Sequence, residues 1–448
     1  MQTIDAINQK ITNGNAVVLT AAELKERVAE GEKVTAADVD VVTTGTFGIM
    51  SGTLAILHIP VADPGSFHHA DRAWLNGVPA VPGPCPNERL GSLDLVVSGT
   101  ARADRWYGGG HLFRDIVEGG EVEVVWEAAG SRFSRTVTLA GMGLARLVTT
   151  RSAYKNYQAI LNRGPGTIRT IFSVRGLTGP CREVSVSGCG DINPLENDPD
   201  GRVIGTGTRI LLNGGIGYIM GPGTRSTRKR PNLAAFADMR QMLPEMMGGF
   251  ATAEGPECTT SVAIPIPVLD DTILRNLLVT NSRIPLPLAD IQDRVPFATS
   301  HYGEVWDGTD GSITYSPESC VQCEPCEAAA LCPAGAITPG GGIDPLRCVH
   351  CGTCIQVCPG GAYSGELGSV TLEGRPIPIT LRQSSRVRAR AICDHLKVPH
   401  PQRRIPDLRE VSGSLVIADS LRQEGDHTTA GAAAAPVPDL VWGCQHQI

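Results

Sequence analysis

The sequence lacks the features that mark membrane-spanning, secreted and nucleic-acid-binding proteins. No apolar run in its 448 residues is long enough to cross a bilayer, and its start, MQTIDAINQKITNGN, has neither the basic region nor the apolar core of a signal peptide. The formal net charge of −7 gives no overall attraction to nucleic acid or to an anionic membrane. We therefore expect a cytoplasmic protein that binds neither nucleic acid nor a membrane.

Familiar catalytic motifs are absent as well. The chain has no Walker loop, no GxSxG nucleophile elbow and no HExxH zinc motif. Its length and its hydrophobic content of 42% are nevertheless enough for two or three domains, at least one with a sizeable core. The chemistry of this large domain is therefore not explained by any of these catalytic motifs.

Local signals predict a mixed α/β or α+β domain with many glycine-rich loops. Thr3 is expected to cap a helix that runs through Ile11, and Thr20 with Glu23 forms a capping box before a second helix. A turn is expected at TTGTFG (43–48), after a strand at 39–42. Further strands are expected at 15–19, 121–126, 167–174 and 208–212, helices at 232–247, 269–279 and 384–397, and a hairpin at 370–383.

Cysteine is unevenly distributed, since eight of the fourteen cysteines lie within the 39 residues from 320 to 358. A disulfide-stabilised secreted domain would be short and would spread its cysteines evenly. Zinc ribbons use two CxxC pairs, whereas this segment has two C-x2-C-x2-C triplets, each followed by a Cys-Pro. The pattern is typical of a bacterial-type ferredoxin with two [4Fe–4S] clusters.

In such ferredoxins a triplet binds one cluster, and the distant Cys-Pro sulfur binds the other. The first Cys-Pro follows its triplet after five residues instead of three, so its loop is longer than in the bacterial pattern. The expected ligands are Cys320, Cys323, Cys326 and Cys358 for cluster one, and Cys348, Cys351, Cys354 and Cys332 for cluster two.

The domain organisation follows from this segment. We expect a catalytic domain over residues 1–310 and the two-cluster ferredoxin domain over 311–366. A hairpin and helix extension would cover 367–400, and a loosely ordered tail 401–448, where HTTAGAAAAPVP is of low complexity.

Five segments of the large domain resemble the homocysteine-biosynthesis family of archaea and anaerobic bacteria. They are VDVVTTGTFG (39–48), YGGGH (107–111), SGCGDINPLENDP (187–199), IGTGTRILLNGGIGY (204–218) and AIPIPVLDD (263–271). Because a ferredoxin pair follows this domain, the chain is also similar to the subgroup called methanogenesis marker 16 metalloproteins. The resemblance covers roughly residues 1–400.

The resemblance implies reductive insertion of sulfur into an aldehyde. For the subgroup, sulfoacetaldehyde, sulfide and two electrons give coenzyme M (2-mercaptoethanesulfonate). The adduct of hydrosulfide and an aldehyde is more oxidised than a thiol by two electrons. Two one-electron clusters can supply that pair of electrons. The implied partners are a small aldehyde, a sulfide or persulfide donor and an external low-potential electron donor, and a homodimer is one assembly that the sequence allows.

Three cysteines outside the ferredoxin segment are candidates to carry the sulfur: Cys85, Cys189 and Cys258, each in a Gly/Pro-rich context that we interpret as a loop. The aspartate-semialdehyde branch of the family uses a cysteine just after TTGTFG, where this chain has Ser51. One of the three could hold a persulfide, or all three could bind a third [4Fe–4S] cluster with an open iron site, or they are inert buried thiols.

Other candidates would bind and protonate the substrate. His111 could hold the carbonyl oxygen or protonate the departing hydroxyl, although a histidine in a Gly-rich loop is as often a structural hydrogen bonder. Arg209 follows glycines that can present N–H groups to an anion, and Gly207 and Thr46 complete the expected binding set. Two alternatives remain: the same chemistry on L-aspartate semialdehyde, giving homocysteine, or a non-catalytic iron–sulfur electron-transfer or assembly subunit.

Overall fold

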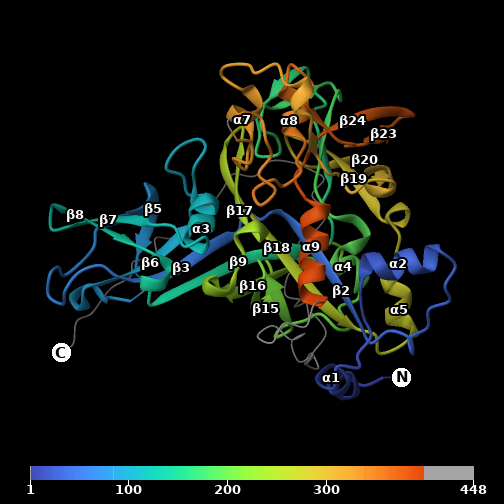
Figure 1. Ribbon diagram of the computed structural model, residues 1–448, viewed down its shortest axis with the longest axis horizontal. Helices are drawn as coiled ribbons and strands as arrows, with labels where there is room; N and C mark the ends of the chain where they lie inside the picture. The colour runs from blue at the N-terminus through green and yellow to red at the C-terminus, as the bar shows by residue number, and fades with distance from the viewer. Residues whose placement is uncertain (1, 84, 339, 398–448) are drawn as a thin grey trace, which may run out of the picture. The chain divides into compact units, whose positions relative to one another are not determined.

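The computed structural model describes residues 2–397 except 84 and 339, and it is a mixed α/β structure built largely from sheet (Figure 1). In the described residues the main sheet has 14 strands, with β17 (Gly248–Thr252) paired to β18. Its order is β1 (Val18–Thr20), β2 (Val41–Ile49), β18 (Gly255–Pro267), β14 (Arg209–Leu212), β15 (Gly215–Pro222), β16 (Asn232–Asp238), β9 (Leu144–Tyr154), β3 (Thr53–Pro60), β6 (Ser92–Ser98), β5 (Val78–Pro82), β4 (Arg72–Leu75), β7 (Val122–Ala128) and β8 (Ser131–Val137).

A second sheet has six strands and joins distant parts of the chain. Its order is β20 (Pro296–His301), β19 (Pro285–Asp290), β10 (Ala159–Leu161), β13 (Val184–Val186), β24 (Arg375–Arg382) and β23 (Ser369–Leu372). Two small pairs complete the described strands: β11 (Gly166–Ile168) with β12 (Leu177–Gly179), and β21 (Thr314–Tyr315) with β22 (Tyr363–Ser364).

The helices of the described residues are short and lie between or against the strands. The α-helices are α1 (Ile4–Thr12), α2 (Ala21–Ala29), α3 (Gly109–Val117), α4 (Pro194–Asn197), α5 (Asp271–Leu277), α6 (Gly303–Trp306), α7 (Glu327–Leu331), α8 (Thr353–Val357) and α9 (Arg386–Lys397). Single 3₁₀ turns cover Glu88–Leu90, Leu139–Gly141, Gly190–Ile192, Met239–Gln241, Pro244–Met246, Asn281–Arg283 and Pro317–Ser319. None of these helices is long and apolar enough to cross a membrane.

Helix α9 packs against β2 and β18, the second and third strands from one edge of the main sheet (Figure 1). A side chain on Gly45 of β2 would meet the Sγ of Cys393 at 2.6 Å and the carbonyl of Ala389 at 2.7 Å. The glycine of TTGTFG is therefore needed for the close approach of the helix to the strand.

The cysteine-bearing segment shares its core with the second sheet. Ala328 of α7 and Val357 of α8 belong to the same buried apolar cluster as Val184 of β13 and Ile379 of β24. The boundaries expected at residues 310 and 366 therefore pass through a continuous core, and β24 of the C-terminal extension pairs with β13 of the first 310 residues. The tail expected at 401–448 lies outside the described residues.

Several local predictions are confirmed. Thr3 caps α1, the capping box of Thr20 and Glu23 begins α2, and α5, α9 and the β23–β24 hairpin lie where they are expected. The expected strands at 15–19, 121–126 and 208–212 correspond to β1, β7 and β14.

Three local predictions are wrong. Residues 232–238 form strand β16 instead of a helix, because they pair on both sides with β15 and β9. The expected turn at TTGTFG is the continuous strand β2, whose threonines pair with β18. Of the strand expected at 167–174, only residues 167 and 168 are extended, within β11. In each wrong prediction, partners distant in sequence outweigh the local propensity.

Candidate functional site

The SGCGD segment is a buried loop held by hydrogen bonds. Cys189 is fully buried, and its Sγ accepts from the Phe47 N–H at 3.5 Å and from the Thr46 hydroxyl at 3.8 Å. Arg386 of α9 donates to the Cys189 carbonyl at 2.9 Å. Burial raises the pKa of Cys189, so the resting group is a thiol. The expected substrate residue Thr46 therefore contacts this sulfur directly.

A buried charge network lies beside this loop. Asp191 Oδ1 pairs with Arg386 Nη2 at 2.8 Å, and its Oδ2 lies 3.7 Å from Lys25 Nζ. Lys25 also donates to the Asp191 carbonyl, and its side chain is only 13% exposed. Burial lowers the pKa of Lys25 to about 8, which Asp191 partly opposes. The network joins α2, the SGCGD loop and α9.

Lys25, Asp191 and Arg386 were not predicted from the sequence. Asp191 stands two residues from Cys189, which is the one local signal. Lys25 and Arg386 lie on helices far away in sequence, and only the fold brings their side chains to the loop.

Three of the four thiols expected to bind cluster one lie near Tyr315 of β21. A hydrogen bond with Cys320 raises the pKa of Tyr315, burial adds to the shift, and Cys326 and Cys358 raise it further. The structure thus brings Cys320 and Cys326 together with the Cys358 that follows the second triplet. The remaining thiol of the set, Cys323, is partly buried in the same segment.

The second group gathers around Cys332. Burial raises the pKa of Cys348, Cys351 and Cys354, and in each case the nearby Cys332 raises it further. The structure thus places the Cys332 of the first motif with the second triplet. Arg388 of α9 donates to the Cys348 carbonyl at 2.9 Å, so the helix that holds the Cys189 loop also holds this segment.

Backbone N–H groups point at these sulfurs. Ala336, His350 and Ala362 donate to Cys332, Cys348 and Cys358 at 3.2, 3.4 and 3.4 Å. All thirteen cysteines of the described residues are free, and Cys444 lies outside these residues. In the part of the chain that the structure describes, no three His, Cys, Asp or Glu side chains converge on a point that would hold a single metal ion. Seven of the eight expected ligands thus fall into two groups, and three of their sulfurs accept backbone N–H bonds, as cluster ligands commonly do.

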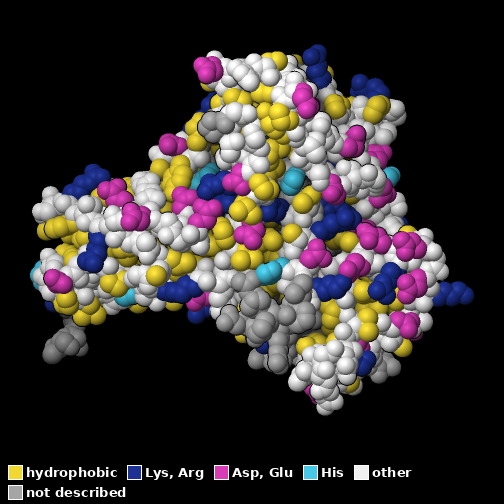
Figure 2. All heavy atoms as spheres, viewed as in Figure 1, with side chains coloured by type: hydrophobic (Ala, Val, Ile, Leu, Met, Phe, Trp, Pro, Cys, Tyr) yellow, Lys and Arg dark blue, Asp and Glu magenta, His cyan; other side chains and the backbone are white. Residues whose placement is uncertain are grey.

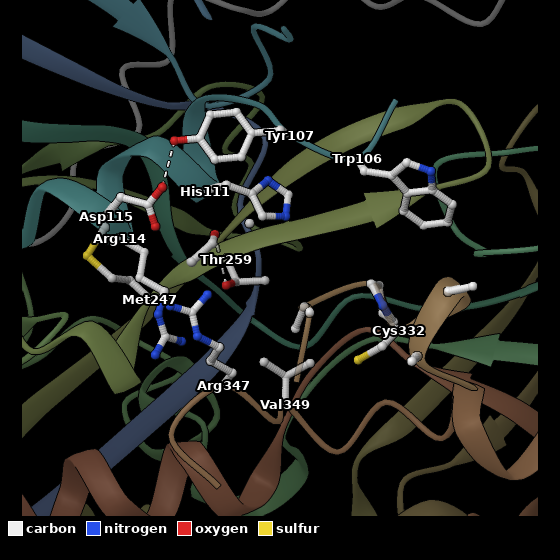
Figure 3. A pocket seen from close by; sticks show the side chains of 17 residues that line it. Trp106, Tyr107, His111, Arg114, Asp115, Met247, Thr259, Cys332, Arg347 and Val349 are labelled. Atoms are coloured by element: carbon white, nitrogen blue, oxygen red, sulfur yellow. Dashed lines mark hydrogen bonds between the residues drawn. The ribbon is translucent and has the colours of Figure 1, made fainter. Parts of the chain in front are cut away.

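A cavity of about 360 Å³ lies between α3 and the loop that carries Cys332 (Figure 3). His111 enters it from α3, and Cys332 lies on the opposite side. Tyr107 stacks on the His111 ring and donates to Asp115 at 2.6 Å. His111, expected in a loop, is in the first turn of α3.

The His111 ring links the two sides of the cavity. Burial lowers the pKa of His111 to about 4, and a hydrogen bond with the Pro333 backbone opposes the shift, so the ring is neutral at pH 7. Its Nδ1 accepts from the Gly108 N–H at 3.3 Å. The Pro333 carbonyl also accepts from the Ala251 N–H of β17 at 2.8 Å. The residue after Cys332 is therefore bonded to both α3 and the main sheet.

Charged groups strengthen the same junction. Glu118 pairs with Arg114 of its own helix at 2.8 Å and with Arg347 of the cysteine-bearing segment at 2.9 Å. Arg114 also donates to the Leu346 carbonyl at 3.1 Å. Elsewhere on the face shown in Figure 2, acidic and basic side chains are mixed, and neither sign forms a continuous patch there.

The remaining expected residues lie apart from Cys189. Cys85 is exposed between β5 and β6, whereas Cys258 is fully buried within strand β18, not in a loop, and packs against Gly99. Burial raises the pKa of Cys258 to about 12. Arg209 lies over the Tyr218 ring of β15, and Gly207 is in the turn before β14. Strand β18 lies between β14 and β2, the strand that carries Thr46. The three candidate thiols thus have different surroundings.

Sequence comparison identifies relatives of this chain. The family described as "Homocysteine biosynthesis enzyme, sulfur-incorporation" matches residues 16–400. An uncharacterized protein of Methanothermobacter thermautotrophicus is 46% identical over 88% of this chain and 92% of its own length. Another from Methanocaldococcus jannaschii is 37% identical over 85% and 96%.

A relative with a stated activity is more distant. The L-aspartate semialdehyde sulfurtransferase of M. jannaschii is 34% identical over 67% of this chain and 62% of its own length. No solved structure matches the chain. With 385 of its residues matched by the family model, this chain belongs to the sulfur-incorporating homocysteine-biosynthesis enzyme family.

Proposed function

We propose that this protein catalyses the reductive thiolation of an aldehyde, with sulfoacetaldehyde as the substrate and coenzyme M (2-mercaptoethanesulfonate) as the product. The balanced reaction joins one aldehyde, one hydrogen sulfide, two electrons and two protons to give one thiol and one water. Family membership supports sulfur incorporation into an aldehyde. The observation that carries the reductive part is the direct bonding of the Cys332–Pro333 loop to His111 and Ala251 of the main domain.

Two [4Fe–4S] clusters are the proposed source of the electrons. Cys320, Cys323, Cys326 and Cys358 would hold one cluster, and Cys348, Cys351, Cys354 and Cys332 the other. The grouping of these thiols around Tyr315 and around Cys332 supports this assignment, as do the N–H donors to their sulfurs. When bound, the clusters supply one electron each at low potential.

Cys189 is the proposed catalytic thiol of the large domain. It would add to the aldehyde carbon to give a hemithioacetal, from which hydrogen sulfide releases the thiol again, so the sulfur of the product comes from sulfide and the two-electron balance holds. Its Sγ accepts two hydrogen bonds, from Phe47 and Thr46, that would also stabilise the thiolate form, and its loop is fixed by Arg386. Cys85 is exposed and Cys258 packs against Gly99, so their surroundings favour a single catalytic thiol over a third cluster. Neutral His111 is proposed to position the Cys332–Pro333 loop against α3, because its one N–H is already bonded to the Pro333 carbonyl.

The sulfide donor and the low-potential electron donor are external partners in this proposal. A second candidate substrate is L-aspartate semialdehyde, which the printed name of the M. jannaschii relative favours. That reaction has the same electron balance and would give homocysteine. The two candidates differ in the groups that accompany the aldehyde: a sulfonate in one, and a carboxylate with an ammonium in the other.

A turnover assay separates these candidates. Anaerobic protein with both clusters loaded is mixed with titanium(III), sulfide and one aldehyde, and the thiol is derivatised and measured by mass spectrometry. Coenzyme M from sulfoacetaldehyde is the expected product, and Cys189→Ala should abolish it while Cys181→Ala, at a half-buried thiol, should not. If homocysteine forms from aspartate semialdehyde instead, that aldehyde replaces sulfoacetaldehyde as the leading substrate. If neither aldehyde yields a thiol, the protein is a non-catalytic electron-transfer protein.

A further inference from the structure

A second, smaller cavity of about 60 Å³ opens beside the SGCGD loop. Its polar lining consists of Ser51, Arg151, Tyr154, Tyr157, Arg294 and Gln383, together with Ser187. One water needs about 10–15 Å³ of the same kind of volume, so this cavity has room for a small head group and little more.

The charge of this cavity is positive. Two arginines line it, and no aspartate or glutamate does. Neither Arg151 nor Arg294 forms an ion pair with any residue that the structure describes, and the Nε of Arg151 is buried without a hydrogen-bond partner. Glu257 lies outside the lining and is hydrogen-bonded to Ser51; burial raises its pKa, and the Ser51 hydrogen bond and the charge of Arg294 lower it by smaller amounts.

Aromatic rings hold both guanidinium groups in place. Arg151 lies 5.7 Å from the ring centre of Tyr154 and 5.9 Å from that of Tyr157, and Arg294 lies 4.7 Å from the ring centre of Phe172. A guanidinium that stacks on an aromatic face keeps its N–H groups free to bind a planar or tetrahedral oxyanion. The cavity therefore has the two preorganised donors that an anion site needs.

The cavity also lies beside the proposed catalytic thiol, Cys189. The Tyr154 hydroxyl lies 2.9 Å from the Ser187 Oγ, two residues before Cys189. Tyr154 and Cys189 are close enough that the sulfur adds to the rise in the pKa of the tyrosine, a rise caused mainly by burial. The wall of the cavity formed by Tyr154 and Ser187 therefore lies next to Cys189.

We infer that Arg151 and Arg294 bind the sulfonate of the aldehyde substrate and exclude an aldehyde that carries an ammonium. The lining offers no carboxylate to pair with an ammonium, whereas it offers two cations to a sulfonate. This inference rests on the proposed function and selects the sulfonate among its two candidate substrates. Arg209, the expected anion-binding residue, lies two strands away from β2 and has no part in it.

A binding measurement tests the inference without turnover. The probe is 2-hydroxyethanesulfonate, which has the sulfonate but no aldehyde, and isothermal titration on the cluster-loaded protein measures its affinity. Arg151→Gln and Arg294→Gln should each weaken binding at least tenfold, the usual effect of removing one charge-assisted hydrogen bond. Homoserine, which carries the ammonium and carboxylate, should bind more weakly than the sulfonate.

Matched controls come from the same protein. Arg146 is on the same strand as Arg151 and lies over the ring of Phe236. Arg163 lies 4.7 Å from the ring centre of Phe297, the same distance as Arg294 from that of Phe172. Their glutamine variants should bind the probe like the wild type. Arg151→Lys, which keeps the charge, should retain part of the affinity, and thermal melting checks that each variant is folded.

The inference is overturned if the two glutamine variants are folded and bind the sulfonate normally, or if homoserine binds more tightly. Its failure differs from that of the proposed function. If the probe binds through these arginines but no aldehyde yields a thiol, the anion site stands and the catalytic proposal falls. If sulfoacetaldehyde is turned over with an unchanged KM in both variants, the catalytic proposal stands and this site falls.

Discussion

The buried Lys25 gives a pH dependence whose sign and size follow from the structure. In the unfolded chain a lysine titrates near 10.4, whereas burial lowers the pKa of Lys25 to about 8 in the folded protein. Between these two values the unfolded chain holds a proton that the folded chain has lost. Raising the pH through this window therefore stabilises the folded state.

The size of the effect follows from the same shift. One pKa unit corresponds to about 1.4 kcal/mol, so a charged Lys25 costs the folded state roughly 3 kcal/mol at pH 7. At pH 9.5 most of this cost is relieved, because the folded protein holds Lys25 neutral while most unfolded chains still hold the proton. We expect the Lys25 contribution to the free energy of unfolding to become about 2 kcal/mol more favourable between pH 7 and pH 9.5.

Urea unfolding of the wild type and of Lys25→Met, at both pH values, isolates this contribution from every other titrating group. The wild type should gain about 2 kcal/mol relative to the variant at the higher pH. Lys10→Met provides the comparison at a lysine that is 42% exposed and pairs with Asp40. If the free energy of unfolding of the wild type minus that of Lys25→Met stays constant, or becomes less favourable to the wild type, as the pH rises, the buried network is refuted.

Two further predictions concern the cavity and the clusters. A side chain on Gly249 would overlap the His111 ring, so Gly249→Ala should lower the thiol-forming rate at least tenfold and destabilise the fold by about 1–3 kcal/mol. Gly141→Ala is the control, because a side chain there would meet no atom within 4 Å, and it should change neither quantity. A normal rate in folded Gly249→Ala would remove His111 from the reaction. Cys351→Ala should reduce the iron from about eight to about four per chain, and Cys181→Ala should leave it unchanged. An unchanged iron content in Cys351→Ala would contradict the ligand assignment.

The elements that the sequence predicts well are those set by neighbouring residues. The caps at Thr3 and Thr20 depend on hydrogen bonds within three residues, and both occur. Strand β16 could not be predicted, because the pattern of residues 232–238 suits a helix and only pairing with β9 and β15 makes it a strand. TTGTFG was expected as a turn for a similar reason: its glycine permits the packing of α9 and does not bend the chain.

The candidate site shows the same division. Cys189 and the eight clustered cysteines are visible in the sequence because their motifs are local. Lys25 and Arg386 are not, since helices at opposite ends of the described chain bring them to Asp191. Arg151 and Arg294 were missed because each is an isolated arginine, and only the fold places both on one cavity.

The central claim is that electrons held within this chain convert an aldehyde and sulfide into a thiol. The most direct test is a single turnover under anaerobic conditions. The loaded protein is reduced, freed of excess reductant, and mixed with sulfide and sulfoacetaldehyde, while the electron paramagnetic resonance of the reduced clusters and the thiol are both measured. We predict that both clusters are oxidised as about one coenzyme M forms per chain, since two one-electron clusters supply one electron pair. Clusters that stay reduced, with no thiol formed, would contradict the claim.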